Sequence, residues 1–305
     1  MTGRAWALFV TMSLVWGLPY LLIKVAVAEV EPSVVVFLRL GLAALVLWPV
    51  TLAAGALRNI RQRWRPLLGV ASAGIVLPFV LIAYGEQHVT SSLAALLIAS
   101  DPLFVVLLAL RFDHSERATG LRLLGLLIGV LGVGVLVGFN VGGDSFATVG
   151  AAMVVVAALC YAGSALMVKS LNDVPRLGSV TVTLSVASLL LAPPALLAWP
   201  ARWPSAAVIV SLLALSILCT ALAYVVYFNL ITTAGATRAS LITYVNPAVA
   251  AVLGAVVLSE PITTSTLVGF GLIVLGCTLS ARPAIGRGVW SSDCNLVPDD
   301  MVQHP

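Results

Sequence analysis

Two ionisable side chains lie deep inside apolar stretches of the sequence, where a charge is costly. Asp101 lies near the middle of the stretch 92–110, and Arg39 lies nearer the N-terminal end of the stretch 32–54. A carboxylate at the centre of a bilayer costs about 2.5–3.5 kcal/mol on insertion scales. We therefore expect Asp101 either to bind and release a proton during transport or to stay neutral and cap backbone carbonyls. Arg39 can pair with Asp101, bind a carboxylate of the substrate, or extend to the lipid headgroups.

Two prolines occupy matching places in two apolar stretches. Pro102 follows Asp101, and Pro247 follows Asn246 in the stretch 240–258. A proline inside a helix removes a backbone donor and loosens the carbonyl four residues back. The pair can therefore act as hinges of two gates or as static kinks that let helices pack. Asn246 offers a donor and an acceptor, and we expect it to line a cavity.

Aromatic side chains recur inside the apolar stretches. They are Trp16, Tyr20, Tyr84, Tyr161, Tyr224, Tyr227 and Tyr244. A Trp or Tyr in a membrane interior needs a polar partner for its N–H or O–H. Together these residues favour a semi-apolar cavity suited to small amphipathic substrates, including aromatic amino acids. The alternative for each of them is ordinary helix packing.

The elements that position these residues follow from composition. The chain of 305 residues is 61% hydrophobic and 9% charged, with a mean hydropathy of +1.11. Soluble domains are about one-quarter charged, so this is an all-α polytopic membrane protein. Ten apolar stretches are each about long enough to cross a bilayer as a helix. They are 5–28, 32–54, 67–87, 91–110, 121–139, 147–168, 178–198, 206–231, 238–258 and 264–281.

The sequence lacks the motifs of several classes of function. The four cysteines have no CxxC spacing, so we expect neither a disulfide framework nor a metal site. The three histidines lie outside the apolar stretches, and the sequence has no hydrolase triad, HExxH motif or phosphate loop. We therefore expect no enzyme, no cofactor and no nucleic-acid partner.

Basic residues gather in alternate connections. Thirteen of the 16 lie on one side if the N-terminus is cytoplasmic, whereas the other side holds Arg202. The positive-inside rule then predicts that both termini are cytoplasmic. The polar segment 283–305 is expected to be a disordered cytoplasmic tail.

The sequence repeats itself internally. At an offset of 145 residues Lys24 matches Lys169 and Pro102 matches Pro247, and at 144 Glu116 matches Glu260. Each half, 1–139 and 140–282, holds five stretches, and an odd number forces the second half to insert upside down. Inverted repeats are typical of transporters that bind their substrate near the midplane.

Residues at the ends of the repeated stretches are expected to be structural. Lys24 and Lys169 should extend to the headgroups. Glu116 and Glu260 should cap the helix that follows each of them. The glycine-rich runs 125–138 and 269–276 have the spacing of close helix contacts, either within the chain or in a homodimer.

The repeat resembles the EamA family of the drug/metabolite transporter superfamily. The resemblance rests on SLITYVNPAVAAVLGAVVLSEPIT and GFGLIVLGCTLS in the second half, and on SLAALLIASDPLFVVLLAL, GLLIGVLGVGVLV and Trp16-Gly17 in the first. It implies ten helices in a bacterial inner (plasma) membrane and export of amino acids or other small metabolites. Asp101 departs from the family pattern, in which the residue before this proline is usually uncharged.

These observations predict a secondary transporter that works by alternating access. It would export amino acids or small amphipathic metabolites or drugs, with a proton antiported through Asp101. The alternative is a gradient-independent facilitator or an importer of a small solute. Because the sequence has no nucleotide-binding motif, transport would use gradients.

Overall fold

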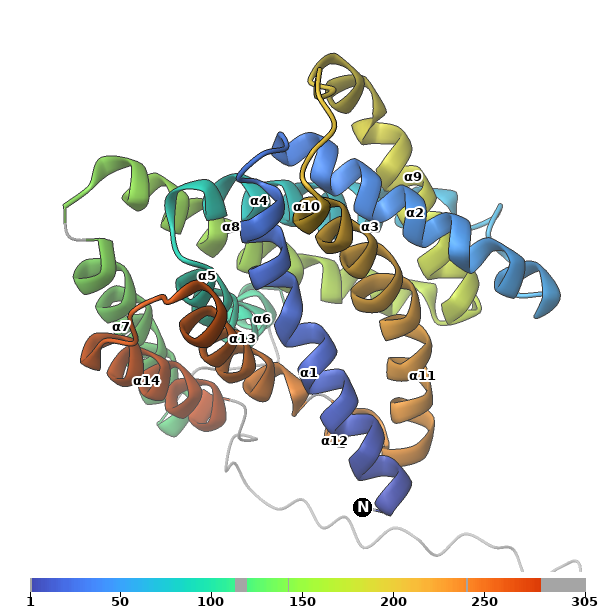
Figure 1. Ribbon diagram of the computed structural model, residues 1–305. Coiled ribbons are helices and arrows are strands. Elements are labelled where there is room, and N and C mark those ends of the chain that lie inside the picture. Colours follow the sequence, from blue (N-terminus) through green and yellow to red (C-terminus); the bar gives the residue numbers. More distant parts are fainter. Residues whose placement is uncertain (1, 113–119, 142, 240, 281–305) are drawn as a thin grey trace, which may run out of the picture.

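The computed structural model describes residues 2–112, 120–141, 143–239 and 241–280, and within them it contains helices and no strands (Figure 1). The predicted tail and Glu116 lie outside these residues. Eight helices are long and apolar enough to cross a membrane. They span Gly3–Ala26, Pro32–Ala53, Trp64–His88, Ser91–Leu108, Leu121–Phe139, Ser145–Val168, Arg176–Leu197 and Ala206–Ala234. Two shorter apolar helices span Ile242–Leu258 and Thr264–Ser280.

Some of these spans contain more than one element. The first two are α1 (Gly3–Ala26) and α2 (Pro32–Ala53). The remaining elements, in order, are α3 (Trp64–Ala71), η1 (Ser72–Val76), α4 (Leu77–His88), α5 (Ser91–Ile98), α6 (Asp101–Phe112), α7 (Leu121–Val141), α8 (Ser145–Val168), η2 (Lys169–Leu171), α9 (Arg176–Leu197), α10 (Ala206–Leu213), η3 (Ala214–Leu222), α11 (Ala223–Ala234), α12 (Ala236–Ala239), α13 (Ile242–Leu258) and α14 (Thr264–Ser280).

The helix ends follow local sequence signals. Pro32 begins α2 at a position where its missing N–H costs nothing. Thr90 begins α5 by accepting a hydrogen bond on its hydroxyl from the N–H of Leu93 at 3.2 Å. Gly235 ends α11 with φ +84°, a conformation that residues with a Cβ rarely adopt.

Two of the long helices contain a π-helical segment. In the span Trp64–His88 this segment is η1, and in the span Ala206–Ala234 it is η3. The hydroxyl of Thr220 donates to the carbonyl oxygen of Leu215, five residues earlier, at 2.7 Å. Such wide turns shift the direction in which later side chains point and are frequent at functional sites.

The helix break at Ala99–Ser100 divides one predicted stretch into α5 and α6. The hydroxyl of Ser100 donates to the carbonyl oxygen of Leu97 at 2.6 Å, and Pro102 is the second residue of α6. Pro247, by contrast, lies inside the continuous helix α13. The two matching prolines therefore have different local roles in this conformation, one at a helix start and one within a helix.

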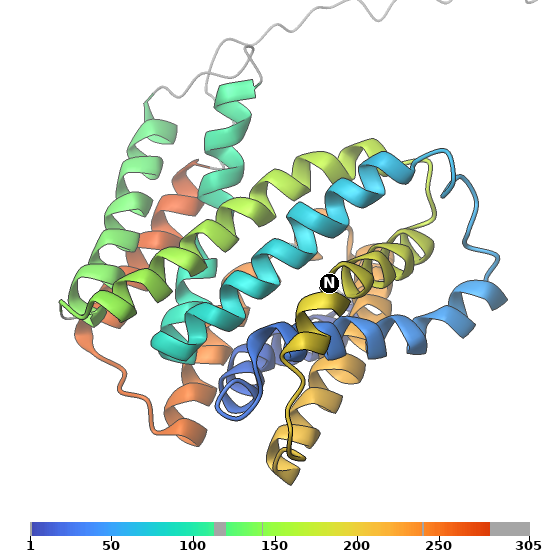
Figure 2. The same cartoon turned by 90° about the horizontal axis from the view of Figure 1, so that it is seen from above.

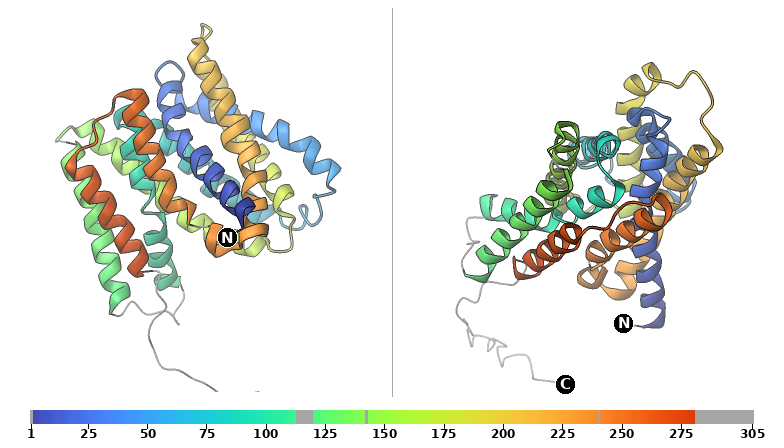
Figure 3. Two further views of the ribbon diagram at one scale, coloured as in Figure 1. Left: turned by 60° about the horizontal axis from the view of Figure 1, so that its bottom comes forward. Right: turned by 60° about the vertical axis from the view of Figure 1, so that its left-hand side comes forward.

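Glycines bring α7 and α14 into contact along their backbones. A methyl group at Gly125 would lie 2.5 Å from the backbone nitrogen of Ser280, and one at Gly132 would lie 2.8 Å from the carbonyl oxygen of Gly269. Figure 3 shows the two helices side by side at one edge of the molecule. The expectation that these glycines serve packing within the chain is confirmed.

The other helices pack around the remaining core. α2 packs on α9, α5 on α13, and α1 on α13. Figure 2 shows α8 running beside α4, where Gly85 and Gly150 allow close approach. Large apolar side chains cover the outside of the molecule, as expected of a surface that faces lipid; Leu197, for example, is 90% exposed.

Candidate substrate cavity

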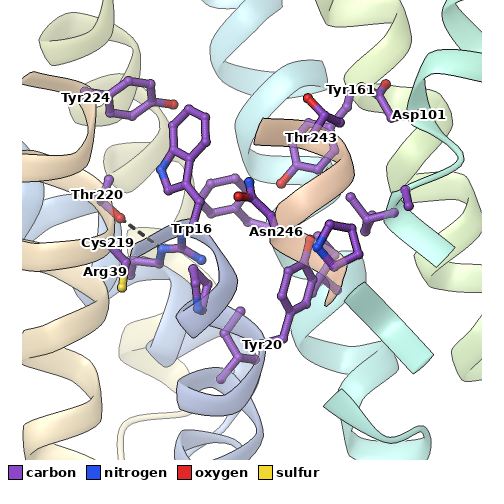
Figure 4. Close-up of a pocket in the computed structure, with 17 residues that line it drawn as sticks. Trp16, Tyr20, Arg39, Asp101, Tyr161, Cys219, Thr220, Tyr224, Thr243 and Asn246 are labelled. Atoms are coloured by element: carbon purple, nitrogen blue, oxygen red, sulfur yellow. Dashed lines mark hydrogen bonds between the residues drawn. The ribbon is translucent and has the colours of Figure 1, made fainter. Parts of the chain in front are cut away.

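A cavity of about 330 Å³ lies at the centre of the helices (Figure 4). Its walls come from α1, α2, α4, α5, α6, α8, η3, α11 and α13. Of the residues that the sequence singled out, the structure brings together Trp16, Tyr20, Arg39, Asp101, Tyr161, Tyr224, Asn246 and Pro247. Cys219, Thr220 and Thr243 also line it, and none of them was singled out from the sequence as a cavity residue.

Arg39 is the cation of this cavity wall. It is 9% exposed, and its Nε donates to the hydroxyl of Thr220 at 3.1 Å. Its guanidinium lies 4.4 Å from the ring centroid of Phe79, a cation–π distance. The side chain therefore points into the protein, and extension to the headgroups is excluded by its position. The π-helical turn of η3 presents Thr220 to Arg39.

Asp101 lies on another part of the wall, at the first turn of α6. Its Oδ1 atom is buried and has no hydrogen-bond partner among the described residues. Figure 4 shows Asp101 and Arg39 on opposite sides of the cavity, and no ion pair joins these two described residues. The direct pair, one of the alternatives for Arg39, is therefore absent in this conformation, and both groups remain available to a ligand.

Aromatic rings support one another around the cavity. Trp16 contacts Tyr224 edge to face, with centroids 6.2 Å apart, and Tyr161 contacts Phe79 in the same way at 6.3 Å. Tyr227 packs against Trp16 at 4.8 Å without lining the cavity. This arrangement gives the cavity stiff apolar walls with phenol groups at their edges.

Two of the selected tyrosines lie elsewhere. The hydroxyl of Tyr84 donates to the carboxylate of Glu31, and the residue does not line the cavity. Tyr244 packs in an apolar cluster that includes Leu96 and Leu136. Both were chosen because they lie within apolar stretches, which does not fix the direction of a side chain.

Asn246 joins the cavity wall to a neighbouring helix. In the amide orientation that satisfies its partners, its nitrogen donates to the carbonyl oxygens of Ser13 (3.3 Å) and Ile242 (3.0 Å). It thereby links α13 to α1 beside Pro247. Gly17 adds to this contact, since a methyl group there would lie 2.5 Å from Val249.

Two charged residues outside the cavity lining, Lys24 and Glu260, differ from expectation. The ammonium of Lys24 donates to the carbonyl oxygens of Glu86 and Val89, the latter at 2.7 Å, so it does not extend to headgroups. Glu260 accepts hydrogen bonds from the N–H groups of Ser91 (2.8 Å) and Ser92 (2.9 Å). It therefore caps α5 and not the helix that follows it, and the prediction was wrong in its partner.

Glu86 is a buried acid that the sequence reasoning missed. Its exposed fraction is 0%, and neither carboxyl oxygen has a hydrogen-bond partner among the described residues. Glu86 lies at the end of the apolar stretch 67–87, where the sequence indicates the start of a polar connection, so its burial was not predicted.

Two acids outside the long helices make charge-assisted contacts. Glu29 accepts from the N–H of Ser205 at 2.8 Å, and hydrogen bonding by the side chain and backbone of Ser205 lowers the pKa of Glu29. Arg63 lies 3.0 Å from Asp173, and their hydrogen bond lowers the pKa of Asp173. These contacts tie connections from the two halves of the sequence together.

Long apolar helices around a cavity with polar and aromatic walls are the architecture of a multi-pass membrane transporter. A model of the EamA-like transporter family matches residues 3–138 and again residues 148–282. The chain belongs to this family, which makes it a transporter of a small molecule in a lipid bilayer and not an enzyme.

Individual relatives span nearly the whole chain. An uncharacterised transporter of Archaeoglobus fulgidus is 29% identical, covering 92% of this chain and 99% of its own. A probable terminal-alkyne amino-acid exporter of Streptantibioticus cattleyicolor is 30% identical, covering 94% and 96%. The uncharacterised inner membrane transporter YedA of Escherichia coli is 25% identical, covering 91% and 89%. A crystal structure at 20% identity superposes with a TM-score of 0.64, covering 92% of this chain and 97% of the other, and supports the fold.

Proposed function

We propose that this chain is a bacterial inner-membrane secondary transporter that exports amino acids or small amphipathic metabolites by alternating access. The observation that carries the proposal is the cavity in which Arg39 lies among aromatic walls. Arg39 uses Nε for Thr220, so its terminal nitrogens can hold a substrate carboxylate. The rings of Trp16 and Tyr161 can hold an apolar side chain. The probable amino-acid exporter at 30% identity supports the same substrate class and direction.

The proposed architecture is ten transmembrane helices in two inverted repeats, 1–139 and 140–282. The family model matches the chain twice, once in each half. Helices at equivalent places in the repeat pack on each other, namely α2 on α9, α5 on α13 and α7 on α14. The third long helix of each half contains a π-helical segment. Pairing of equivalent elements is what a two-fold relation between the halves produces.

We assign both termini to the cytoplasm from the distribution of Lys and Arg. The connections that carry Glu29, Arg202 and Glu260 then lie at the outer face. Transport is driven in this proposal by proton antiport through Asp101, whose Oδ1 atom is buried and unpartnered beside the cavity.

The test is uptake of labelled amino acids and amphipathic compounds into inverted vesicles, with and without a proton gradient. We expect gradient-driven accumulation by the unaltered protein and its loss in Asp101→Asn, because the amide carries no exchangeable charge. Asp144→Asn is the matched control, since Asp144 is exposed, directly precedes α8 and accepts from the N–H of Phe146. Equilibration of the solute that is independent of the proton gradient in both proteins would make the chain a facilitator, and transport in the opposite direction would make it an importer.

A further inference from the structure

Glu86 belongs to a group of interacting residues that we call the Glu86 cluster. The cluster contains Lys24, Glu86, Val89, Ser91, Ser92 and Glu260. It joins the end of α1, the junction of α4 and α5, and the segment that follows α13. The carboxylate of Glu260 accepts three hydrogen bonds from Ser91 and Ser92, whereas the carboxyl group of Glu86 has no hydrogen-bond partner among the residues that the structure describes.

The surroundings of Glu86 cannot stabilise a carboxylate in this arrangement. Ionised acids removed from water need hydrogen bonds or a contacting cation, and in their absence the neutral form is favoured. Lys24 is the nearest cation on α1, but its ammonium is held by the carbonyl oxygens of Glu86 and Val89. The side-chain oxygens of Glu86 therefore carry a proton here.

The other titratable groups around Glu86 belong to α1, α2 and the segment that follows α13. Tyr20 and Lys24 on α1, Arg39 on α2 and Glu260 after α13 all interact with it electrostatically. α8 packs on α4 through small residues such as Gly150, and the segments α5 and η1 contain no titratable side chain. Among the described residues, only Lys24 combines a positive charge with a direct hydrogen bond to the backbone of Glu86.

We propose that Glu86 is a proton-binding site that controls closure of this end of the transporter. Loss of the proton to water leaves a carboxylate, which attracts the ammonium of Lys24 away from the two carbonyl oxygens. The carbonyl of Glu86 belongs to the last turn of α4, and that of Val89 belongs to its C-cap residue. The ammonium of Lys24 joins both of these carbonyls to α1. Proton release therefore loosens α1 from the α4–α5 junction, and proton uptake restores the contact.

The site rests on the proposed function only for its role in transport. With the assigned orientation the Glu86 cluster lies at the outer face, so a proton arriving from outside would close that face. This is the order of events that proton antiport requires. Asp101 lines the cavity at the start of α6, whereas Glu86 in α4 does not line it, so the two acids are separate sites.

The test measures the proton directly. In purified protein in lipid nanodiscs, infrared spectra are recorded as the pH is raised. We expect a band of a protonated carboxyl group that is lost in Glu86→Gln and kept in the control Glu29→Gln, whose carboxylate is hydrogen-bonded to Ser205. In Lys24→Gln the band should persist to higher pH, because the carboxylate has lost its counter-ion. Glu86→Asp should move the band without removing it, which covers the case in which Glu86→Gln does not fold.

The outcomes separate the two proposals. An identical band in the unaltered protein and Glu86→Gln at every pH would overturn the proton site even if transport is gradient-driven. A band that is lost in Glu86→Gln but insensitive to Lys24→Gln would overturn the closure mechanism. Failure to find any accumulated solute would count against the proposed function and leave the infrared result standing.

Discussion

Arg39 on α2 and Thr220 in the π-helical segment of η3 are joined by a hydrogen bond of 3.1 Å from Nε to the hydroxyl oxygen. The same hydroxyl donates to the carbonyl oxygen of Leu215 at 2.7 Å. The wide turn thus fixes the threonine, and the threonine fixes the guanidinium. This chain of contacts holds the terminal nitrogens of Arg39 in the cavity without neutralising their charge.

Replacing Arg39 by Lys should weaken binding of a substrate carboxylate. Lysine lacks the planar fork and cannot use one nitrogen for Thr220 and two for a ligand. Hydrogen bonds to charged groups contribute about 1.5–3 kcal/mol, so affinity should fall roughly 10–100-fold. The measurement is the concentration dependence of uptake, with Arg202→Lys in a connection as the control. An unchanged half-saturation concentration would show that Arg39 does not hold the substrate.

Replacing Glu260 by Ala should destabilise the fold. The carboxylate accepts from the N–H groups of Ser91 and Ser92, so its loss leaves two donors at the start of α5 without a partner. Loss of a cap costs about 0.5–2 kcal/mol. Thermal unfolding in detergent should show a lower transition temperature than for Asp144→Ala, which removes a hydrogen bond at the exposed start of α8. Equal transition temperatures would mean that the contact across the two halves adds nothing.

Replacing Gly132 by Ala should separate α7 from α14. The added methyl group would lie 2.8 Å from the carbonyl oxygen of Gly269, which belongs to rigid backbone. Overpacking of this kind costs about 1–3 kcal/mol. Gly134 is the control because a methyl group there meets nothing within 4 Å. Thermal unfolding should distinguish the variants, and equal stability of Gly132→Ala and Gly134→Ala would contradict the packing.

The contact between Glu29 and Ser205 should depend on pH. Hydrogen bonds from Ser205 lower the pKa of Glu29 in the folded protein, so the carboxylate stabilises the fold above its unfolded pKa of about 4.3. This stabilisation is lost as the pH falls through the lower folded value. Between about pH 5 and pH 3 the unaltered protein should therefore lose more stability than Glu29→Gln, as followed by thermal unfolding. If the transition temperatures of the two proteins fell in parallel with pH, the stabilising role of the Glu29 carboxylate would be refuted.

The sequence predicted the positions of the helices well. Apolar length sets where a helix can begin and end, and the structure has helices in the predicted stretches. Arg39, Asp101, Trp16 and Asn246 meet in one cavity. Each was selected because a charged or polar group inside an apolar stretch is costly without a partner or a cavity, and this signal can be read from the sequence.

The direction of side chains could not be predicted in the same way. Each residue turns a helix by about 100°, and a π-helical segment changes the count. Tyr84 was therefore selected although it contacts Glu31, and Thr220 was not selected although it holds Arg39. Glu260 caps α5 across a separation of 168 residues in sequence, a partner that no local signal reveals.

The backbone contact between α7 and α14 has a consequence for the covalent continuity of the chain. Each of these helices ends one half of the sequence, and neither lines the cavity. The glycines of the two helices pack closely, and one added methyl group would clash with the facing backbone. A protein cleaved between α7 and α8 would thus still have this helix–helix interface between its two fragments. Two half-chains synthesised from separate genes could associate through α7 and α14 and form the complete transporter.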